Sequence, residues 1–159
     1  RIVPVAEREG VKLALHPDDP PMSPLKHQER IIISPEAFDR VFALNDSPAN
    51  GMCLCQGSFA SMGDHDIPAL IRHFGRRIHY VHFRDVVGAV PRFRETFHDT
   101  GKTDMAACIR AYREIGFTGP ARPDHVPTLE GESNELAGYH MMGRLFAVGY
   151  MRGLLDATA

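Results

Sequence analysis

The chain has 159 residues, a formal net charge of −2 and a pI near 6.5, with 43% hydrophobic and 24% charged residues. This length is enough for one domain with a hydrophobic core. The charge provides no basic field for nucleic acid or an anionic membrane surface, and no apolar stretch reaches the roughly 20 residues of a membrane helix. The odd set Cys53, Cys55 and Cys108 lacks the spacing of a disulfide framework, so we expect a cytoplasmic protein.

The first third of the chain predicts a helix end, a strand, a rigid loop and a second helix. Residues 2–9 are typical of a helix end, and the strand after them ends at His16. Three prolines in residues 17–22 remove backbone donors and fix φ, which predicts a rigid loop after the strand. A serine followed by proline then opens a helix predicted over residues 34–44.

The rest of the chain continues this alternation of strands and helices, with residues 85–103 predicted as a loop. Turn residues separate the elements, and Gly116 and Gly119 end the helix that Asp104 opens. The predicted elements are a turn over 45–51, a strand ending at Cys55, a helix over 66–75, a strand over 77–83, a helix opened by Asp104 and continuing to Ile115, a strand over 120–124 and a long helix over 133–157.

The order βαβαβαβα predicts an α/β fold with a parallel sheet and right-handed crossovers. Four such units make half of an eight-stranded (β/α)8 barrel. Standing alone, they would expose two strand edges and an uncovered sheet face. We therefore expect residues 1–159 to be half of one barrel domain, completed by four more units from a lost N-terminal region or from another chain.

Each predicted strand ends at a side chain that can bind a metal: His16, Cys55, His82 and Asp124. Ends of parallel strands meet on one face of the fold, and alternation places Cys55 on the same strand face as Cys53. Two imidazoles, a thiolate and a carboxylate suit a divalent transition metal. Mn²⁺ or Fe²⁺ takes more than four ligands and would keep coordination positions open for substrate. Zn²⁺ would be fully coordinated by these four side chains and would more naturally be structural. Taken singly, each of these four residues is more typical of a core, rim or capping residue. Their common position at strand ends nevertheless favours a metal site.

Other polar residues are expected near the same carboxyl ends of the predicted strands. His125 has an ordinary pKa suited to acid–base catalysis, although a loop hydrogen bond is the alternative. Arg84 is a candidate clamp for a substrate carboxylate or a partner of its acidic neighbour. We also expect His98 and Arg122 to reach substrate, whereas Tyr139, on the final predicted helix, is by itself more typical of packing.

Six strings spread over nearly the whole chain resemble mannonate dehydratase. The first and the fifth are the most specific. The strings are His16-Pro17-Asp18-Asp19-Pro20-Pro21, the turn Asp46-Ser47-Pro48-Ala49-Asn50-Gly51, Cys55 with Gly57-Ser58, His82-Phe83-Arg84, Arg122-Pro123-Asp124-His125-Val126-Pro127, and Gly138-Tyr139 through Gly143-Arg144-Leu145-Phe146-Ala147.

This resemblance implies the C-terminal half of a TIM barrel of the xylose-isomerase-like type. It implies a lyase (hydro-lyase) of hexuronate (glucuronate) breakdown that converts D-mannonate to 2-keto-3-deoxy-D-gluconate and water with Mn²⁺ or Fe²⁺. A homo-oligomer that needs the N-terminal half of the barrel is expected, without nucleic-acid or membrane partners. Carried over by position, the metal ligands would be His16, Cys55, His82 and Asp124, and the proton-transfer pair His125 and Tyr139, with acid and base unassigned.

Two other functions remain open from the sequence. The same barrel could carry a metal-dependent sugar isomerase or epimerase, which would use similar ligands. The chain could also be an inactive half-barrel that binds metal without turnover.

Overall fold

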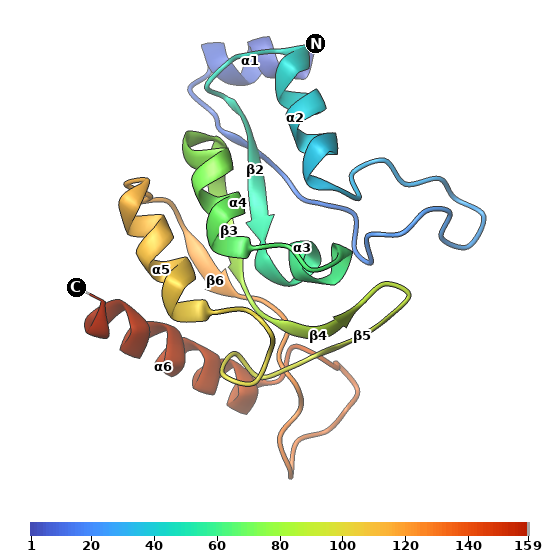
Figure 1. Ribbon diagram of the computed structural model, residues 1–159, viewed down its shortest axis with the longest axis vertical. Helices are drawn as coiled ribbons and strands as arrows, with labels where there is room; N and C mark the ends of the chain where they lie inside the picture. The colour runs from blue at the N-terminus through green and yellow to red at the C-terminus, as the bar shows by residue number, and fades with distance from the viewer. Residues whose placement is uncertain (159) are drawn as a thin grey trace.

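A four-stranded parallel sheet runs through the computed structural model, which describes residues 1–158 (Figure 1). The strand order β1-β2-β3-β6 follows the chain, and each pair of neighbours is parallel. This arrangement confirms the predicted α/β class and sheet direction. The strands are β1 (Leu13–Leu15), β2 (Asn50–Cys55), β3 (Ile78–Phe83) and β6 (Ala121–Pro123).

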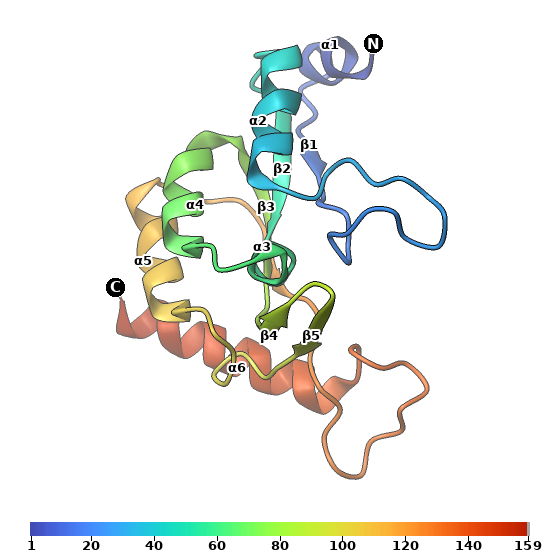
Figure 2. The ribbon, with the colours of Figure 1, turned by 45° about the vertical axis from the view of Figure 1, so that its right-hand side comes forward.

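Helices α2, α4, α5 and α6 follow one another along one side of the sheet (Figure 2). Three of them begin at side-chain caps: Ser34, Asp66 and Asp104 each accept a hydrogen bond from a first-turn N–H, as the sequence predicts. No helix of the described residues is long and apolar enough to cross a membrane. The helices are α1 (Ile2–Arg8), α2 (Pro35–Leu44), α4 (Ile67–Phe74), the 3₁₀ turn η1 (Gly75–Arg77), α5 (Met105–Glu114) and α6 (Met141–Ala157).

The hydrophobic core lies between the sheet and these helices. Alternation along β2 and β3 sends one set of strand side chains into the core, and Cys108 of α5 is buried there. The opposite set includes the half-buried Tyr80 and His82, and no described helix covers that face (Figure 2). The core set comprises Met52, Leu54, Val81 and Phe83, packed with Phe38, Phe59, Ile71, Phe74 and Ile109.

Phe59 is expected to be essential for this core. It is fully buried, and its ring centroid lies 5.6 Å from that of Phe38 and 5.9 Å from that of Phe74. Phe59→Ala should lower the free energy of unfolding by about 3–5 kcal/mol, measured by urea denaturation. Leu44→Ala is the control, because Leu44 is 85% exposed and its loss should change stability by less than about 0.5 kcal/mol. Similar losses in both variants would contradict this packing.

The prediction of a loop over residues 85–103 is wrong for its first half. The segment contains an antiparallel hairpin of β4 (Val86–Ala89) and β5 (Arg92–Glu95). The buried Asp85 ties the hairpin and the following loop to the sheet, because its carboxylate accepts hydrogen bonds from Val86 N, Thr103 N and Thr103 Oγ1. Both strands have only four residues, and β5 (Arg-Phe-Arg-Glu) is mostly charged, so the sequence offers no apolar run that would reveal β5 as the partner of β4.

Two helix predictions also need correction. A short helix, α3 (Gln56–Met62), follows β2 directly and was not predicted. The final helix begins at Met141 instead of residue 133, because residues 126–140 fold back as a loop. Val126 N donates to Gly138 O, and Gly138 has φ +89°, which does not continue a helix. Tyr139 therefore lies in this loop and not on the helix.

Candidate active site

Three of the predicted metal ligands converge where β1, β2 and β3 end. His16 follows β1, and the sheet register places Cys55 of β2 beside His82 of β3. Their ligand atoms all lie within 4.8 Å of one another, and His16 Nε2 is 3.1 Å from His82 Nδ1. Two imidazole nitrogens and a thiol sulfur are ligands that divalent transition metals accept. We call these three residues the His-Cys-His group; its donor set fits a metal ion.

Asp124 lies at the edge of the His-Cys-His group. It follows β6, and its nearly buried side chain places Oδ2 3.4 Å from His82 Nδ1. Arg122, two residues earlier and paired with His82 in the sheet register, donates from Nη2 to Asp124 Oδ1 at 2.6 Å. The four side chains that were predicted as ligands therefore meet at one end of the sheet.

The electrostatics of the metal-free group favour a thiolate and an imidazolium. Burial alone would raise the pKa of Cys55, but the Arg84 guanidinium and hydrogen bonds from His16 and His82 lower it to about 5. For His82, burial opposes the charge, yet hydrogen bonds to Asp124 and to cysteine sulfur raise its pKa to about 11. The thiolate of Cys55 is thus already in the form that binds metal, whereas His82 must lose its proton before it can bind a metal ion.

Metal binding should therefore release protons. At pH 7 the thiol of Cys55 is already ionised, whereas His82, with a pKa of about 11, still carries its proton. We expect release of at least about one proton per metal ion, and an affinity that falls as the pH is lowered. Calorimetric titration with Mn²⁺ in two buffers of different ionisation enthalpy measures this release. A heat that does not depend on the buffer would contradict the assignment of His82.

Arg84 contacts the His-Cys-His group through Cys55, and its side chain is fully buried. Its Nε is 3.2 Å from Cys55 Sγ and 3.2 Å from Asp124 Oδ2. Its two terminal nitrogens lie 2.5 Å from Glu95 Oε1 and 2.5 Å from Asp19 Oδ2. With a further hydrogen bond from Nη2 to Ser58 Oγ at 3.1 Å, the guanidinium is engaged by five protein groups, of which Cys55 and Asp124 are predicted metal ligands.

The alternative partner considered for Arg84, its neighbour Asp85, is wrong, because that carboxylate binds Thr103 instead. Gly57 explains how so large a side chain fits here. A Cβ at this position would lie 2.6 Å from the Nη1 atom of Arg84, so only glycine leaves room for the guanidinium.

The structure places His98 inside the protein and not at the mouth of the site. Its side chain is 1% exposed, its Nε2 hydrogen-bonds to Phe83 O, and its ring stacks against that of Phe83. The expectation that it reaches substrate is therefore not supported by its position. Arg122, by contrast, keeps 40% of its side chain exposed beside Asp124.

His125 and Tyr139 form a second pair next to the metal ligands. His125 Nε2 is 2.8 Å from Tyr139 Oη and 3.6 Å from Asp124 Oδ2. On its other side, His125 Nδ1 is 3.3 Å from Glu95 Oε1, a contact that raises the pKa of His125 against the effect of burial. These side chains line a pocket of about 390 Å³ together with Gly138. From the sequence, Tyr139 was assigned to this pair only through the family resemblance, and Glu95 was not predicted at all.

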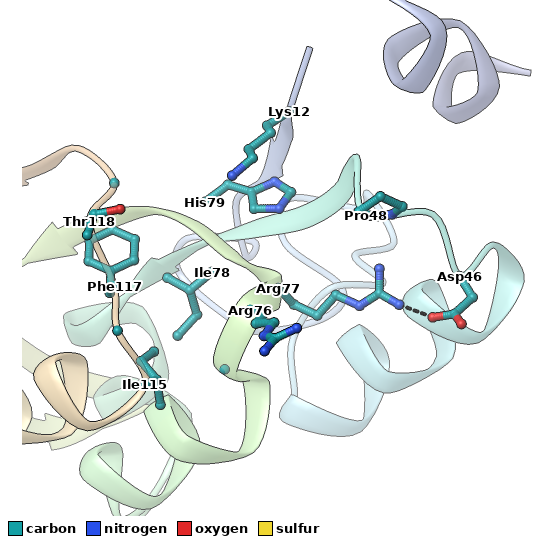
Figure 3. A pocket seen from close by; sticks show the side chains of 13 residues that line it. Lys12, Asp46, Pro48, Arg76, Arg77, Ile78, His79, Ile115, Phe117 and Thr118 are labelled. Carbon is teal, nitrogen blue, oxygen red and sulfur yellow. Dashed lines mark hydrogen bonds and ion pairs between the residues drawn. The ribbon is translucent and has the colours of Figure 1, made fainter. Parts of the chain in front are cut away.

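Another pocket, of about 750 Å³, lies at the opposite end of the sheet (Figure 3). Its walls include Lys12, Arg76 and Arg77, near the amino ends of the strands. Arg77 already pairs with Asp46 and donates to Ser47 O, so its charge is used within the protein. Catalytic side chains of parallel barrels sit at the carboxyl ends of the strands, which favours the His-Cys-His end as the functional site.

The parallel sheet, with side chains that could hold a metal ion at the carboxyl ends of its strands, matches about half the length of solved TIM-barrel structures. The fold matches the xylose isomerase domain protein from Planctomyces limnophilus with a TM-score of 0.72 at 16% identity, covering 99% of this chain and 51% of that one. It also matches the IOLI protein crystallised with a zinc atom, with a TM-score of 0.67 at 19% identity over 98% and 53% of the two chains. These likenesses show the fold alone.

The family D-mannonate dehydratase (UxuA) matches residues 1–159, and the chain belongs to it. The chain is 40% identical to mannonate dehydratase 2 from Halalkalibacterium halodurans over 99% of its own length and 47% of that relative. It matches the crystal structure of mannonate dehydratase from Streptococcus suis serotype 2 with a TM-score of 0.91 at 36% identity, over 99% and 46% of the two chains. The chain therefore spans about half the length of the relatives it matches.

Proposed function

We propose that this chain supplies the metal-binding and proton-transfer half of a mannonate dehydratase, a hydro-lyase that forms 2-keto-3-deoxy-D-gluconate and water from D-mannonate in hexuronate (glucuronate) catabolism. The observation that carries the proposal is the meeting of the His-Cys-His group with His125 and Tyr139 at one sheet end. Membership of the D-mannonate dehydratase family supports it. The preceding half of the TIM barrel, from a longer form of this chain or from another chain, would supply the remaining wall of the site; we call the assembled protein the complete barrel.

The donor set suits Mn²⁺ or Fe²⁺, held by His16, Cys55, His82 and Asp124. Histidine nitrogen, thiolate and carboxylate are all ligands of these ions, and four such groups leave open positions on an ion that takes more than four. When bound, the ion would stabilise the negative charge that develops next to the carboxylate of the sugar acid.

His125 and Tyr139 would carry the protons. Dehydration breaks the C2–H bond and the C3–O bond, so it needs a base for the C2 proton and an acid for the leaving hydroxyl. Their contact of 2.8 Å and the pocket that both line place two groups capable of these roles side by side. Arg122, exposed beside Asp124, would bind the substrate carboxylate.

The test is product analysis on the complete barrel. With Mn²⁺ and D-mannonate we expect a metal-dependent product that lacks one water and carries a keto group at C2, identified by NMR and mass spectrometry, and loss of activity with a chelator. An isomer of the same mass as the substrate would instead identify an isomerase or epimerase. A protein that binds metal but leaves D-mannonate unchanged would refute the proposed dehydration.

A further inference from the structure

Glu95 ends the hairpin strand β5 and points its carboxylate toward the proton-transfer pair. Its Oε1 is 3.3 Å from His125 Nδ1 and 2.5 Å from Arg84 Nη1. Its Oε2 is buried without a hydrogen-bond partner among the described residues, and the side chain lines the same pocket as Tyr139. Nothing in the sequence pattern of residues 85–103 marks this position.

We propose that Glu95 is a positioning residue for the reaction: it fixes the ring of His125 with the proton on Nδ1 and leaves Nε2 facing Tyr139. This inference rests on the proposed dehydration, in which His125 moves a proton. Its geometry, however, can be tested without turnover.

The argument begins with the two nitrogens of a neutral imidazole, of which one donates and the other accepts. An ionised carboxylate only accepts, so the contact with Glu95 requires the proton on Nδ1 of His125. Nε2 then keeps a free lone pair, and the hydroxyl of Tyr139, 2.8 Å away, can donate to it. A carboxylate behind a catalytic histidine sets tautomer and ring orientation in this way in other enzymes.

Asp124 is less able to play this part, although it is also close. Its Oδ2 lies 3.6 Å from Nε2 of His125 and is shared with His82 at 3.4 Å and Arg84 at 3.2 Å. Glu95, in contrast, contacts the other ring nitrogen and is itself held by Arg84. One buried guanidinium thus fixes both the metal ligands and the group that orients the histidine.

The test compares Glu95→Ala, Glu95→Gln and the control Arg94→Ala in the complete barrel. For Glu95→Ala we expect kcat to fall about 10- to 100-fold with KM and metal content nearly unchanged. The Gln variant keeps an amide oxygen that can accept from His125 and should recover much of that loss. Arg94 is exposed on the same strand, so its removal should leave kcat within about twofold.

A second readout follows the tautomer itself. Long-range ¹H–¹⁵N correlation spectra of the metal-free complete barrel should show the His125 proton on Nδ1, and in Glu95→Ala it should move toward Nε2. Unchanged kcat or an unchanged tautomer in Glu95→Ala would overturn the inference. If the Ala variant loses metal or fold, the Gln variant decides: a kcat far below wild type with metal retained would also overturn it. If wild type leaves D-mannonate unchanged, the proposed function fails, and the tautomer still tests Glu95.

Discussion

His125→Asn in the complete barrel is expected to lose dehydration of D-mannonate by about 100-fold or more while it retains its metal. The amide cannot take up and deliver a proton near neutral pH as an imidazole does, and general acid–base catalysis contributes about 10²- to 10⁴-fold. Metal should remain, because His125 lies outside the His-Cys-His group. Initial rates on D-mannonate together with metal analysis of the purified variant measure both effects.

The control for this variant is His73→Asn. His73 lies on α4, is about half exposed, and its Nε2 is 2.9 Å from Asp39 Oδ1 at the surface. Its substitution should leave the rate within about twofold of wild type, as expected for a surface change far from the site. Near-normal turnover in His125→Asn would show that His125 does not carry a proton in the reaction.

Arg84→Met should destabilise the protein and disrupt the metal-binding site. The side chain is fully buried, and its loss leaves the carboxylates of Asp19, Glu95 and Asp124 and the thiolate of Cys55 without their common cation. Breaking a buried charge network in this way costs about 3–5 kcal/mol. We therefore expect a large fall in the free energy of unfolding, measured with urea, and a loss of bound metal.

Arg84→Lys should rescue little, because a single ammonium cannot reach the groups that the planar guanidinium contacts together. Arg72→Met is the matched control. Arg72 pairs with Glu114 at 2.6 Å on the surface, where solvent screens the charges, so its loss should change stability far less than the loss of Arg84. A stable, metal-loaded Arg84→Met variant that only raises KM would instead support the earlier expectation of a substrate clamp.

The strand-end residues could be predicted from sequence because simple local rules apply to them. Apolar runs bounded by turns predict the strands, alternation places Cys55 on the strand face of Cys53, and the carboxyl ends of parallel strands are expected to meet. The register of β2 and β3 confirms that these two residues are neighbours. Helix starts at Ser34 and Asp104 followed from capping chemistry in the same way.

What the sequence missed depends on contacts between distant segments. The β4–β5 hairpin is a local pairing of two four-residue strands, but the contact that ties the loop after it to the end of β3 joins the buried Asp85 to Thr103, 18 residues away. The loop before α6 is closed by a hydrogen bond between Val126 and Gly138, which removes Tyr139 from the helix on which it was expected. Glu95 gains its importance only from this tertiary arrangement, because it meets His125 across 30 residues of chain.

The most direct test of the account is complementation between this chain and the preceding half of a relative's barrel. Each half is assayed alone and after co-expression, with Mn²⁺ and D-mannonate, and bound metal is measured in every sample. We predict that the halves alone are inactive or nearly so, and that the co-expressed pair binds metal and forms the 2-keto-3-deoxy acid. We also predict that His125→Asn in this chain abolishes that activity. A purified, metal-loaded pair that forms no such product, or a pair whose activity survives His125→Asn, would contradict the account.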